Sequence, residues 1–365
     1  MKISNNKFTV ALKWSGKVLL AVCLILASCL IYNFLLVPPL QTTNIGTFMA
    51  DLNSQEENVD TLFLGTSKTY RGVDSVYLSE ELGENVFNVG SNSGTYISMY
   101  YLLNEICKTN EISTVFLEVS FINFKRSSGT EDKDIYRLLS GQNKKDYKEA
   151  ISLDYNDTKI FEFVNYLNNF SNGKFIDNLD FIFSSDKSIG AGISSKKSVY
   201  KGHGFGYADS EISDVENLSL PNRYLTNGRV WDEKDVDELA LEYFYKILDY
   251  CQENEIEIVL YSPPYPHIII EKYYDWFMAF DNSLYKFIED YPNLKYLDFS
   301  KIRNDYMQLS ANYFYNANHC NGLGAKTLAP ILRDIYLEIE NDTFSAEKWF
   351  YTDFEEYMIN NSQEV

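Results

Sequence analysis

The stretch "LFLGTSKTYRG" (residues 62–72) begins the pattern that decides the fold. Large apolar residues run up to Gly65, after which Thr66 and Ser67 follow and the apolar pattern stops. A buried strand that ends in this way has two explanations. Ser67 either belongs to a plain turn or helix cap, or it is a nucleophile held at the carboxyl edge of a sheet. The remaining strands and the histidines are needed to distinguish the two.

Five short apolar runs have the length of strands. Several are separated by helix-like stretches, such as residues 94–110 and 235–255. Strands that alternate with helices imply parallel pairing, with helices on both faces of the sheet. We therefore expect an α/β three-layer sandwich with a five-stranded parallel sheet. The five runs are "VDTLFLG" (59–65), "NVFNVG" (85–90), "STVFLEVS" (113–120), "IEIVLYSP" (256–263) and "LKYLDFS" (294–300).

A long segment, residues 125–233, interrupts this alternation between the third and fourth runs. It contains an amphipathic pattern at 144–170 and a loop-like stretch at 184–210. A structureless loop of that length is uncommon in a compact domain, so we expect an insertion that packs over the sheet edge as a lid or substrate wall. The predicted division is 58–124 and 234–340 for the α/β domain, 125–233 for the insertion and 341–365 for a tail with a final helix.

The N-terminal part of the chain predicts a membrane anchor. Residues 18–40 are apolar and long enough to cross a hydrocarbon core of about 30 Å as a helix. Four lysines precede them, which favours a cytoplasmic segment 1–17 and makes 41–57 a linker to the domain. A cleavable signal, including the lipoprotein-like "LASC" that ends at Cys29, is the competing interpretation. The apolar run continues beyond Cys29, which favours an uncleaved anchor, and both interpretations place the domain outside the cytoplasm.

Composition excludes several classes of function. The chain has 32 basic and 52 acidic residues and a formal charge of -20, which argues against nucleic acid as a partner because such binding needs phosphates to be neutralised. Cys107, Cys251 and Cys320 are too few and too scattered for a disulfide framework. Three histidines without paired spacing predict no metal site, and no cofactor is expected.

The exits of the strands carry the chemistry, because ligands of doubly wound sheets bind at the carboxyl ends of the strands. Ser67 follows the first run and Gly90 the second, and the late stretch "YFYNANHCNGLGA" places His319 before a helix start. This set resembles the SGNH (GDSL-like) hydrolases over roughly residues 58–124 and 235–335. The resemblance is to a membrane-anchored bacterial cell-envelope branch that includes the alginate O-acetylation and teichoic-acid D-alanylation proteins, and it implies a flavodoxin-like sandwich.

The resemblance implies a role for each matching residue. Ser67 matches the nucleophile and His319 the general base, since acyl transfer needs a base to take the hydroxyl proton. Gly90 matches the glycine whose backbone N–H joins that of Ser67 in an oxyanion hole. The family's third-block asparagine has no clear match, and Asn92 is the substitute donor that we prefer, with Asn123 as another.

One position departs from the family pattern. The family has Asp three residues before the histidine, whereas this chain has Asn316. In serine proteases the same replacement lowers kcat about 10⁴-fold, because the histidine adopts the wrong tautomer. Three possibilities follow: a backbone carbonyl orients His319 in a Ser–His dyad, a carboxylate such as Asp298 or Asp305 takes the role, or the chemistry has been lost.

The expected function is a membrane-anchored, extracytoplasmic O-acyltransferase or esterase that acts through a serine acyl-enzyme on acyl groups of a cell-envelope polysaccharide or polymer. The resemblance also implies a membrane-bound acyl-donor protein as partner. The alternative is a catalytically degenerate binding or scaffold protein of the same fold in a polymer-modification system. Asn316 favours the alternative, whereas the presence of both Ser67 and His319 favours chemistry.

Overall fold

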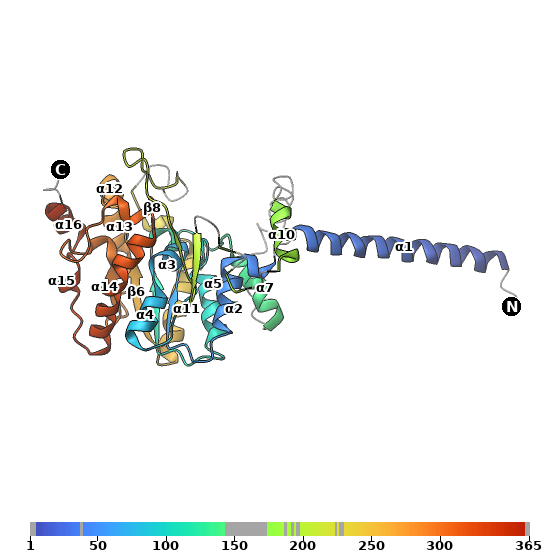
Figure 1. Cartoon of the computed structure of the whole chain (residues 1–365), viewed down its shortest axis with the longest axis horizontal. Helices are drawn as coiled ribbons and strands as arrows, with labels where there is room; N and C mark the ends of the chain where they lie inside the picture. The colour runs from blue at the N-terminus through green and yellow to red at the C-terminus, as the bar shows by residue number, and fades with distance from the viewer. Residues whose placement is uncertain are drawn as a thin grey trace.

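The structure is a computed structural model, and the residues that it describes form an α/β domain with a long N-terminal helix (Figure 1). The amphipathic pattern at 144–170 lies outside the described residues. The described residues are 5–36, 39–142, 174–185, 188–190, 193–194, 198–222, 225 and 230–361.

A five-stranded parallel sheet lies at the centre, with strand order β2-β1-β3-β6-β7. Each strand falls inside one of the five predicted runs, so the predicted sheet is confirmed. The order is that of flavodoxin-like doubly wound sheets, in which the switch point lies between the first and third strands. The strands are β1 (Thr61–Leu64), β2 (Val86–Asn88), β3 (Thr114–Glu118), β6 (Glu257–Ser262) and β7 (Lys295–Asp298).

Helices cover the sheet in two groups (Figure 1). In one group α5 (Tyr96–Ile106) packs against α11 (Glu238–Glu253), and in the other α14 (Gly322–Glu340) packs against α3 (Ser67–Gly72) and α4 (Ser75–Leu82). The strands between them are mostly buried and carry a majority of apolar residues, as expected of parallel strands covered on both faces. Other helices among the described residues are α6 (Phe121–Phe124), α7 (Asp132–Gln142), α10 (Lys174–Phe183), α12 (His267–Lys272), α13 (Tyr274–Phe287), α15 (Ala346–Trp349), α16 (Phe354–Asn361), η3 (Glu233–Asp235), η4 (Phe299–Lys301) and η5 (Ala311–Tyr313).

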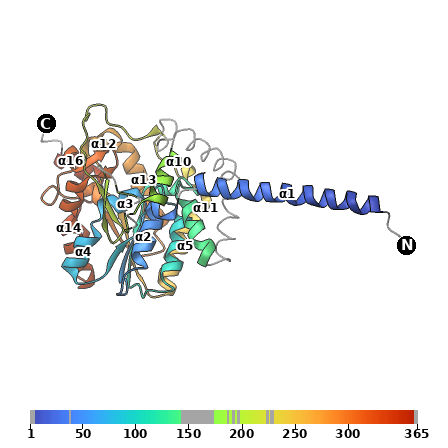
Figure 2. The same cartoon turned by 45° about the vertical axis from the view of Figure 1, so that its right-hand side comes forward.

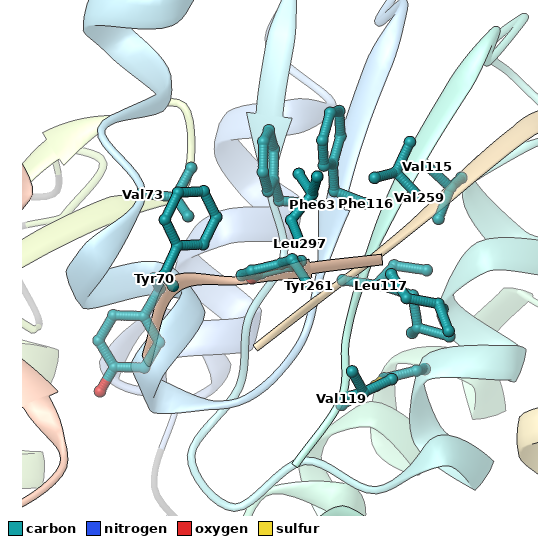
Figure 3. Close-up of a cluster of buried hydrophobic side chains, with 14 of the residues drawn as sticks. Phe63, Tyr70, Val73, Val115, Phe116, Leu117, Val119, Val259, Tyr261 and Leu297 are labelled. Carbon is teal, nitrogen blue, oxygen red and sulfur yellow. The ribbon is translucent and has the colours of Figure 1, made fainter. Parts of the chain in front are cut away.

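Aromatic residues fill the core beside α3 (Figure 3). Phe63 of β1 lies opposite Phe116 of β3 in the parallel register, and the two rings stack with centroids 4.5 Å apart. Tyr261 of β6 meets Phe63 edge-on at 5.8 Å. Truncation of a buried Phe to Ala typically costs about 3–5 kcal/mol, so this cluster gives the strand exits a rigid support.

The expected linker at 41–57 is instead part of the domain. It forms η1 (Leu40–Thr42) and α2 (Asn44–Leu52), and Ile45 and Phe48 are fully buried. Phe48 packs edge-on against Tyr70 of α3, with ring centroids 5.5 Å apart. The prediction of a linker was wrong because the short apolar face of α2 packs into the core beside α3.

The loop-like end of the insertion contains an antiparallel hairpin of β4 (Ser198–Gly202) and β5 (Phe205–Ala208). Its turn residues, His203 and Gly204, have φ of 49° and 76°. A Cβ at Gly204 would lie 1.6 Å from the carbonyl oxygen of Asn88, so only glycine allows this approach. The backbone N–H of Asn88 donates to the carbonyl of His203 at 2.9 Å. The hairpin therefore covers the outer edge of β2, which would otherwise be open for pairing.

The two ends of the chain differ in how they relate to the domain. α1 (Asn5–Leu36) extends away from it in both views (Figures 1 and 2). Among the described residues, no helix has the length and apolar character needed to cross a membrane. At the other end, the predicted final helix is present as α16, and its Phe354 and Tyr357 are buried against the domain.

Candidate active site

Three residues that the sequence singled out lie together in the structure. Ser67 Oγ is 2.7 Å from His319 Nε2, and His319 Nδ1 is 2.9 Å from Asn316 Oδ1. Ser67 is the first residue of α3, whose cap Thr66 accepts the N–H of Lys68. The other two residues pair with each other across a small ladder formed by β8 (Phe314–Asn316) and β9 (His319–Cys320). The arrangement has the geometry of a nucleophile, a base and an orienting group.

A backbone donor fixes which atom of Asn316 faces the histidine. The N–H of Asn318 donates to Asn316 Oδ1 at 3.0 Å, so the atom at that position is the amide oxygen, which is an acceptor only. His319 Nδ1 must then carry the proton that it shares with this oxygen. Nε2 is left as the acceptor for the hydroxyl of Ser67, which is the tautomer that a general base requires.

This geometry bears on what orients His319. Asn316 Oδ1 itself lies within hydrogen-bond distance of His319 Nδ1. Asp298 ends β7, accepts the N–H of Ser300 at 3.0 Å and lies 3.8 Å from the ammonium of Lys301. Asp305 is exposed to solvent. The expectation that either carboxylate could replace Asn316 is therefore not met.

A buried carboxylate that the sequence analysis passed over holds the nucleophile turn. Glu118 is fully buried at the end of β3 and accepts the N–H of Thr66 at 2.7 Å and the hydroxyl of Thr69 at 2.6 Å. Its Oε1 lies 3.1 Å from the ammonium of Lys68. Burial alone would raise the pKa of Glu118, but the charge of Lys68 and the threonine hydrogen bonds outweigh it and lower that pKa.

The same network extends to the fourth strand of the sheet. The hydroxyl of Tyr261 on β6 donates to Thr69 Oγ1 at 2.6 Å, and Lys68 Nζ donates to the hydroxyl of Tyr265 at 3.1 Å. Gly65 allows this close packing, because a Cβ there would lie 1.8 Å from Thr69 Oγ1. The residues on both sides of Ser67 are thus buried and fixed, while Ser67 itself remains partly exposed. The only sequence signal was a charged residue inside the apolar run "STVFLEVS".

Gly90 does not present its N–H in the way that the resemblance implied. That N–H donates to Asn88 Oδ1 at 2.9 Å inside the protein. The glycine has a packing reason instead, because a Cβ there would lie 2.6 Å from the carbonyl oxygen of Thr66. Ser67 lies at the first position of its helix, where a backbone N–H has no acceptor within the helix. Its own N–H is therefore the better backbone candidate for binding an oxyanion.

The two asparagine candidates are held differently. Asn92 donates from Nδ2 to Glu131 Oε1 at 2.7 Å and accepts the hydroxyl of Tyr70 at 2.8 Å, so its amide is fixed beside α3. Burial raises the pKa of Glu131 to about 7. Asn123 is fully buried, and its Nδ2 has no hydrogen-bond partner in the described part of the chain. Among the described contacts, neither the amide of Asn92 nor that of Asn123 is hydrogen-bonded to Ser67.

The other histidines and the nearby cysteine have structural surroundings. His267 Nδ1 lies 3.0 Å from the hydroxyl of Tyr357, and His203 Nδ1 lies 3.1 Å from the carbonyl oxygen of Val86. Burial raises the pKa of the Cys320 thiol to about 12, so this residue is a poor nucleophile. Within the described ranges, no group of three or more His, Cys, Asp or Glu side chains could hold a metal ion.

Comparisons with known proteins give one distant likeness. No protein-family model matches the chain, and no curated protein matches it. Among solved structures, one described as "a putative platelet activating factor from Streptococcus pneumonia" is similar, with a TM-score of 0.37 and 14% sequence identity. The match covers 86% of this chain and 99% of that chain. A likeness this distant carries no functional argument, so function has to be argued from the site.

Proposed function

We propose that the protein is an SGNH-like serine esterase or O-acyltransferase. One observation carries the proposal: Ser67 Oγ lies 2.7 Å from His319 Nε2 while Asn316 Oδ1 holds Nδ1 at 2.9 Å. The hydroxyl and the base are already within the distance that proton transfer needs. The nucleophile also stands at the carboxyl end of β1, next to the switch point of the sheet.

The proposed reaction has two half-reactions. Ser67 Oγ attacks the acyl carbonyl as its proton moves to His319 Nε2, and the N–H of Ser67 stabilises the oxyanion. The imidazolium returns the proton to the departing alcohol, which leaves an acyl ester on Ser67. Water or a sugar hydroxyl then gives its proton to Nε2 and attacks this ester. The imidazolium returns that proton to Ser67 Oγ as the bond between the acyl group and Oγ breaks, which yields the acid or the transferred ester and restores Ser67.

The neutral orienting group limits the rate of this reaction. Asn316 holds the correct tautomer, but it does not stabilise the imidazolium as an aspartate would. A hydrogen bond to a charged group typically contributes about 1.5–3 kcal/mol, whereas one between neutral groups contributes about 0.5–1.5 kcal/mol. We therefore propose a slow enzyme, suited to modifying a polymer in place.

Location, substrate and partner belong to the proposal as well. Val18, Leu19, Ile25 and Leu26 of α1 are each about 60% exposed, and such a surface supports attachment of α1 to a membrane. We propose that the domain then acts outside the cytoplasm on acyl groups of a cell-envelope polymer, with a membrane-bound acyl donor. These statements rest on the N-terminal sequence and the family resemblance.

Labelling of the full chain with a fluorophosphonate probe tests the proposal. We expect the native protein and Asn316→Asp to label, and Ser67→Ala to remain unlabelled. Absence of label from all three proteins, with release of acetate from acetylated polymer also undetectable, would contradict the enzyme assignment.

The second candidate is a binding or scaffold protein with the same fold. The neutral Asn316 is the observation that favours it. In that case only Asn316→Asp would label, because the scaffold would be intact while the base was too weak. The native protein would then bind an acylated polymer without releasing its acyl groups.

A further inference from the structure

Arg71 lies one helical turn beyond the nucleophile. Both residues belong to α3 (Ser67–Gly72), and positions i and i+4 share one face of a helix. Their Cα atoms are separated by about 6 Å along the helix axis. Ser67 and Arg71 are both partly exposed, whereas Lys68, Thr69 and Tyr70 between them are buried. The helix therefore presents a hydroxyl and a guanidinium together.

Aromatic rings hold the guanidinium in place. Its Cζ lies 5.0 Å from the ring centroid of Tyr70 and 5.2 Å from that of Tyr315. Tyr315 in turn stacks on the ring of His319, with centroids 5.2 Å apart and planes at 24°. The ring of Tyr315 thus contacts both the guanidinium of Arg71 and the imidazole of His319. Arg71 therefore lies close to the proposed base as well as to Ser67.

The charge of Arg71 has no carboxylate partner among the described residues. Its NH1 lies 3.4 Å from Ser198 Oγ. Burial raises the pKa of the Tyr70 phenol, and the charge of Arg71 opposes that rise. Nε is buried without a hydrogen-bond partner. Arg137, Arg303 and Arg333 each have an acidic partner within 3.5 Å. The chain has a net charge of -20, yet Arg71, one helical turn from Ser67, has no carboxylate partner among the described residues.

From these contacts we infer that Arg71 is the anion-binding subsite for a substrate that carries a carboxylate or phosphate close to its ester. A guanidinium is planar and remains charged, so it binds such oxyanions with paired hydrogen bonds. An anion there would pair with the terminal guanidinium nitrogens, of which NH1 has only a long contact with Ser198 Oγ. The inference deepens the proposed function and rests on it for the position of the ester.

Three acetate esters of similar shape test the inference on the full chain. They are 4-acetoxybenzoate, 4-acetoxyphenyl phosphate and the neutral 4-acetoxybenzamide, and kcat/KM is measured for each. We expect the native protein to prefer at least one anionic ester over the amide by about 10- to 100-fold. The favoured anion distinguishes a carboxylate-bearing from a phosphate-bearing substrate.

Variants of Arg71 show whether the preference comes from this residue. In Arg71→Gln the anionic-to-neutral ratio should fall to about one, and Arg71→Lys should retain part of it because charge remains without the planar fork. Arg137→Gln removes a paired arginine elsewhere and should keep the native ratio. An equal rate for all three esters in the native protein, or an unchanged ratio in both Arg71 variants, would overturn the inference.

A binding measurement separates this inference from the proposed function. If the native protein hydrolyses none of the esters, the esterase proposal fails, and calorimetric titration with 4-hydroxybenzoate, 4-hydroxyphenyl phosphate and 4-hydroxybenzamide takes over as the test. At least tenfold tighter binding of one anion than of the amide, lost in Arg71→Gln, would support the anion subsite. Equal binding of all three would reject it.

Discussion

The two halves of the candidate site are held by different physical means. The turn that carries Ser67 is fixed by a buried carboxylate, a buried ammonium and threonine hydroxyls. The ladder that carries His319 is held by neutral hydrogen bonds, chiefly those of Asn316 Oδ1. Charged groups in a low-dielectric interior are costly to disturb, whereas neutral hydrogen bonds each contribute about 0.5–1.5 kcal/mol. We therefore expect the turn that carries Ser67 to be rigid and the ladder that carries His319 to rearrange more easily.

Glu118→Gln should give the largest effect, because it leaves the buried ammonium of Lys68 without a counter-charge. Removing one partner of a buried pair typically costs about 3–5 kcal/mol. We expect that loss in the free energy of unfolding, measured by urea denaturation. Glu242→Gln is the matched control, because Glu242 and Lys246 form an exposed pair worth less than about 1 kcal/mol. Equal losses of unfolding free energy in the two variants would contradict the prediction that buried charges hold the turn of Ser67.

Acid should remove part of the same stabilisation. The folded state lowers the pKa of Glu118 from its ordinary 4.5, so folding favours the ionised form. The contribution is complete above pH 4.5 and is lost as the pH falls through the lower, folded-state pKa. Stability curves between pH 6 and pH 2 should be steeper below pH 4.5 in the native protein than in Glu118→Gln. Parallel curves would show that Glu118 does not titrate in this window.

Asn316→Ala tests the base half with a smaller expected effect. Without the acceptor, His319 loses its fixed tautomer, and we expect kcat/KM for a reactive ester to fall by about 10- to 100-fold. The free energy of unfolding should fall by about 1–3 kcal/mol, since two neutral hydrogen bonds are lost. A loss of stability as large as that of Glu118→Gln would show that the two halves are equally rigid.

Asn316→Asp sharpens the comparison by placing a charge in the base half. The carboxylate keeps the bonds to His319 Nδ1 and to the N–H of Asn318, and it stabilises the imidazolium. We expect the rate at which a fluorophosphonate labels Ser67 to rise about tenfold. A slower reaction in this variant would mean that the neutral amide is the better partner here.

The parts predicted from the sequence are those with local signals. The strands appeared as short apolar runs, and Ser67, Asn316 and His319 stand at strand or ladder ends within two short motifs. The network around Glu118 was missed because it depends on β1 and β3 lying side by side, which brings together residues about 50 positions apart. The N–H of Gly90 was misassigned because the side chain of Asn88 folds back onto it.

Two further elements were missed because tertiary contacts stabilise them. The segment that contains α2 is short and flanked by polar residues, and only the fit of Ile45 and Phe48 into the core makes it part of the domain. The β4–β5 hairpin contains three glycines in eleven residues and forms against the edge of β2. Neither element has a periodic pattern long enough to predict its structure from sequence alone.

The position of the insertion has a consequence for how the chain folds. β2, β1 and β3 come from one continuous stretch, but the partner of β3 on its other side, β6, begins only at Glu257. Closing a flexible loop becomes costlier only slowly with length, by about 0.6 kcal/mol for each doubling, whereas contacts distant in sequence slow folding. We expect the three N-terminal strands to assemble first during synthesis. The nucleophile turn would then complete its bond to Tyr261 only after the ribosome has made the second half of the sheet.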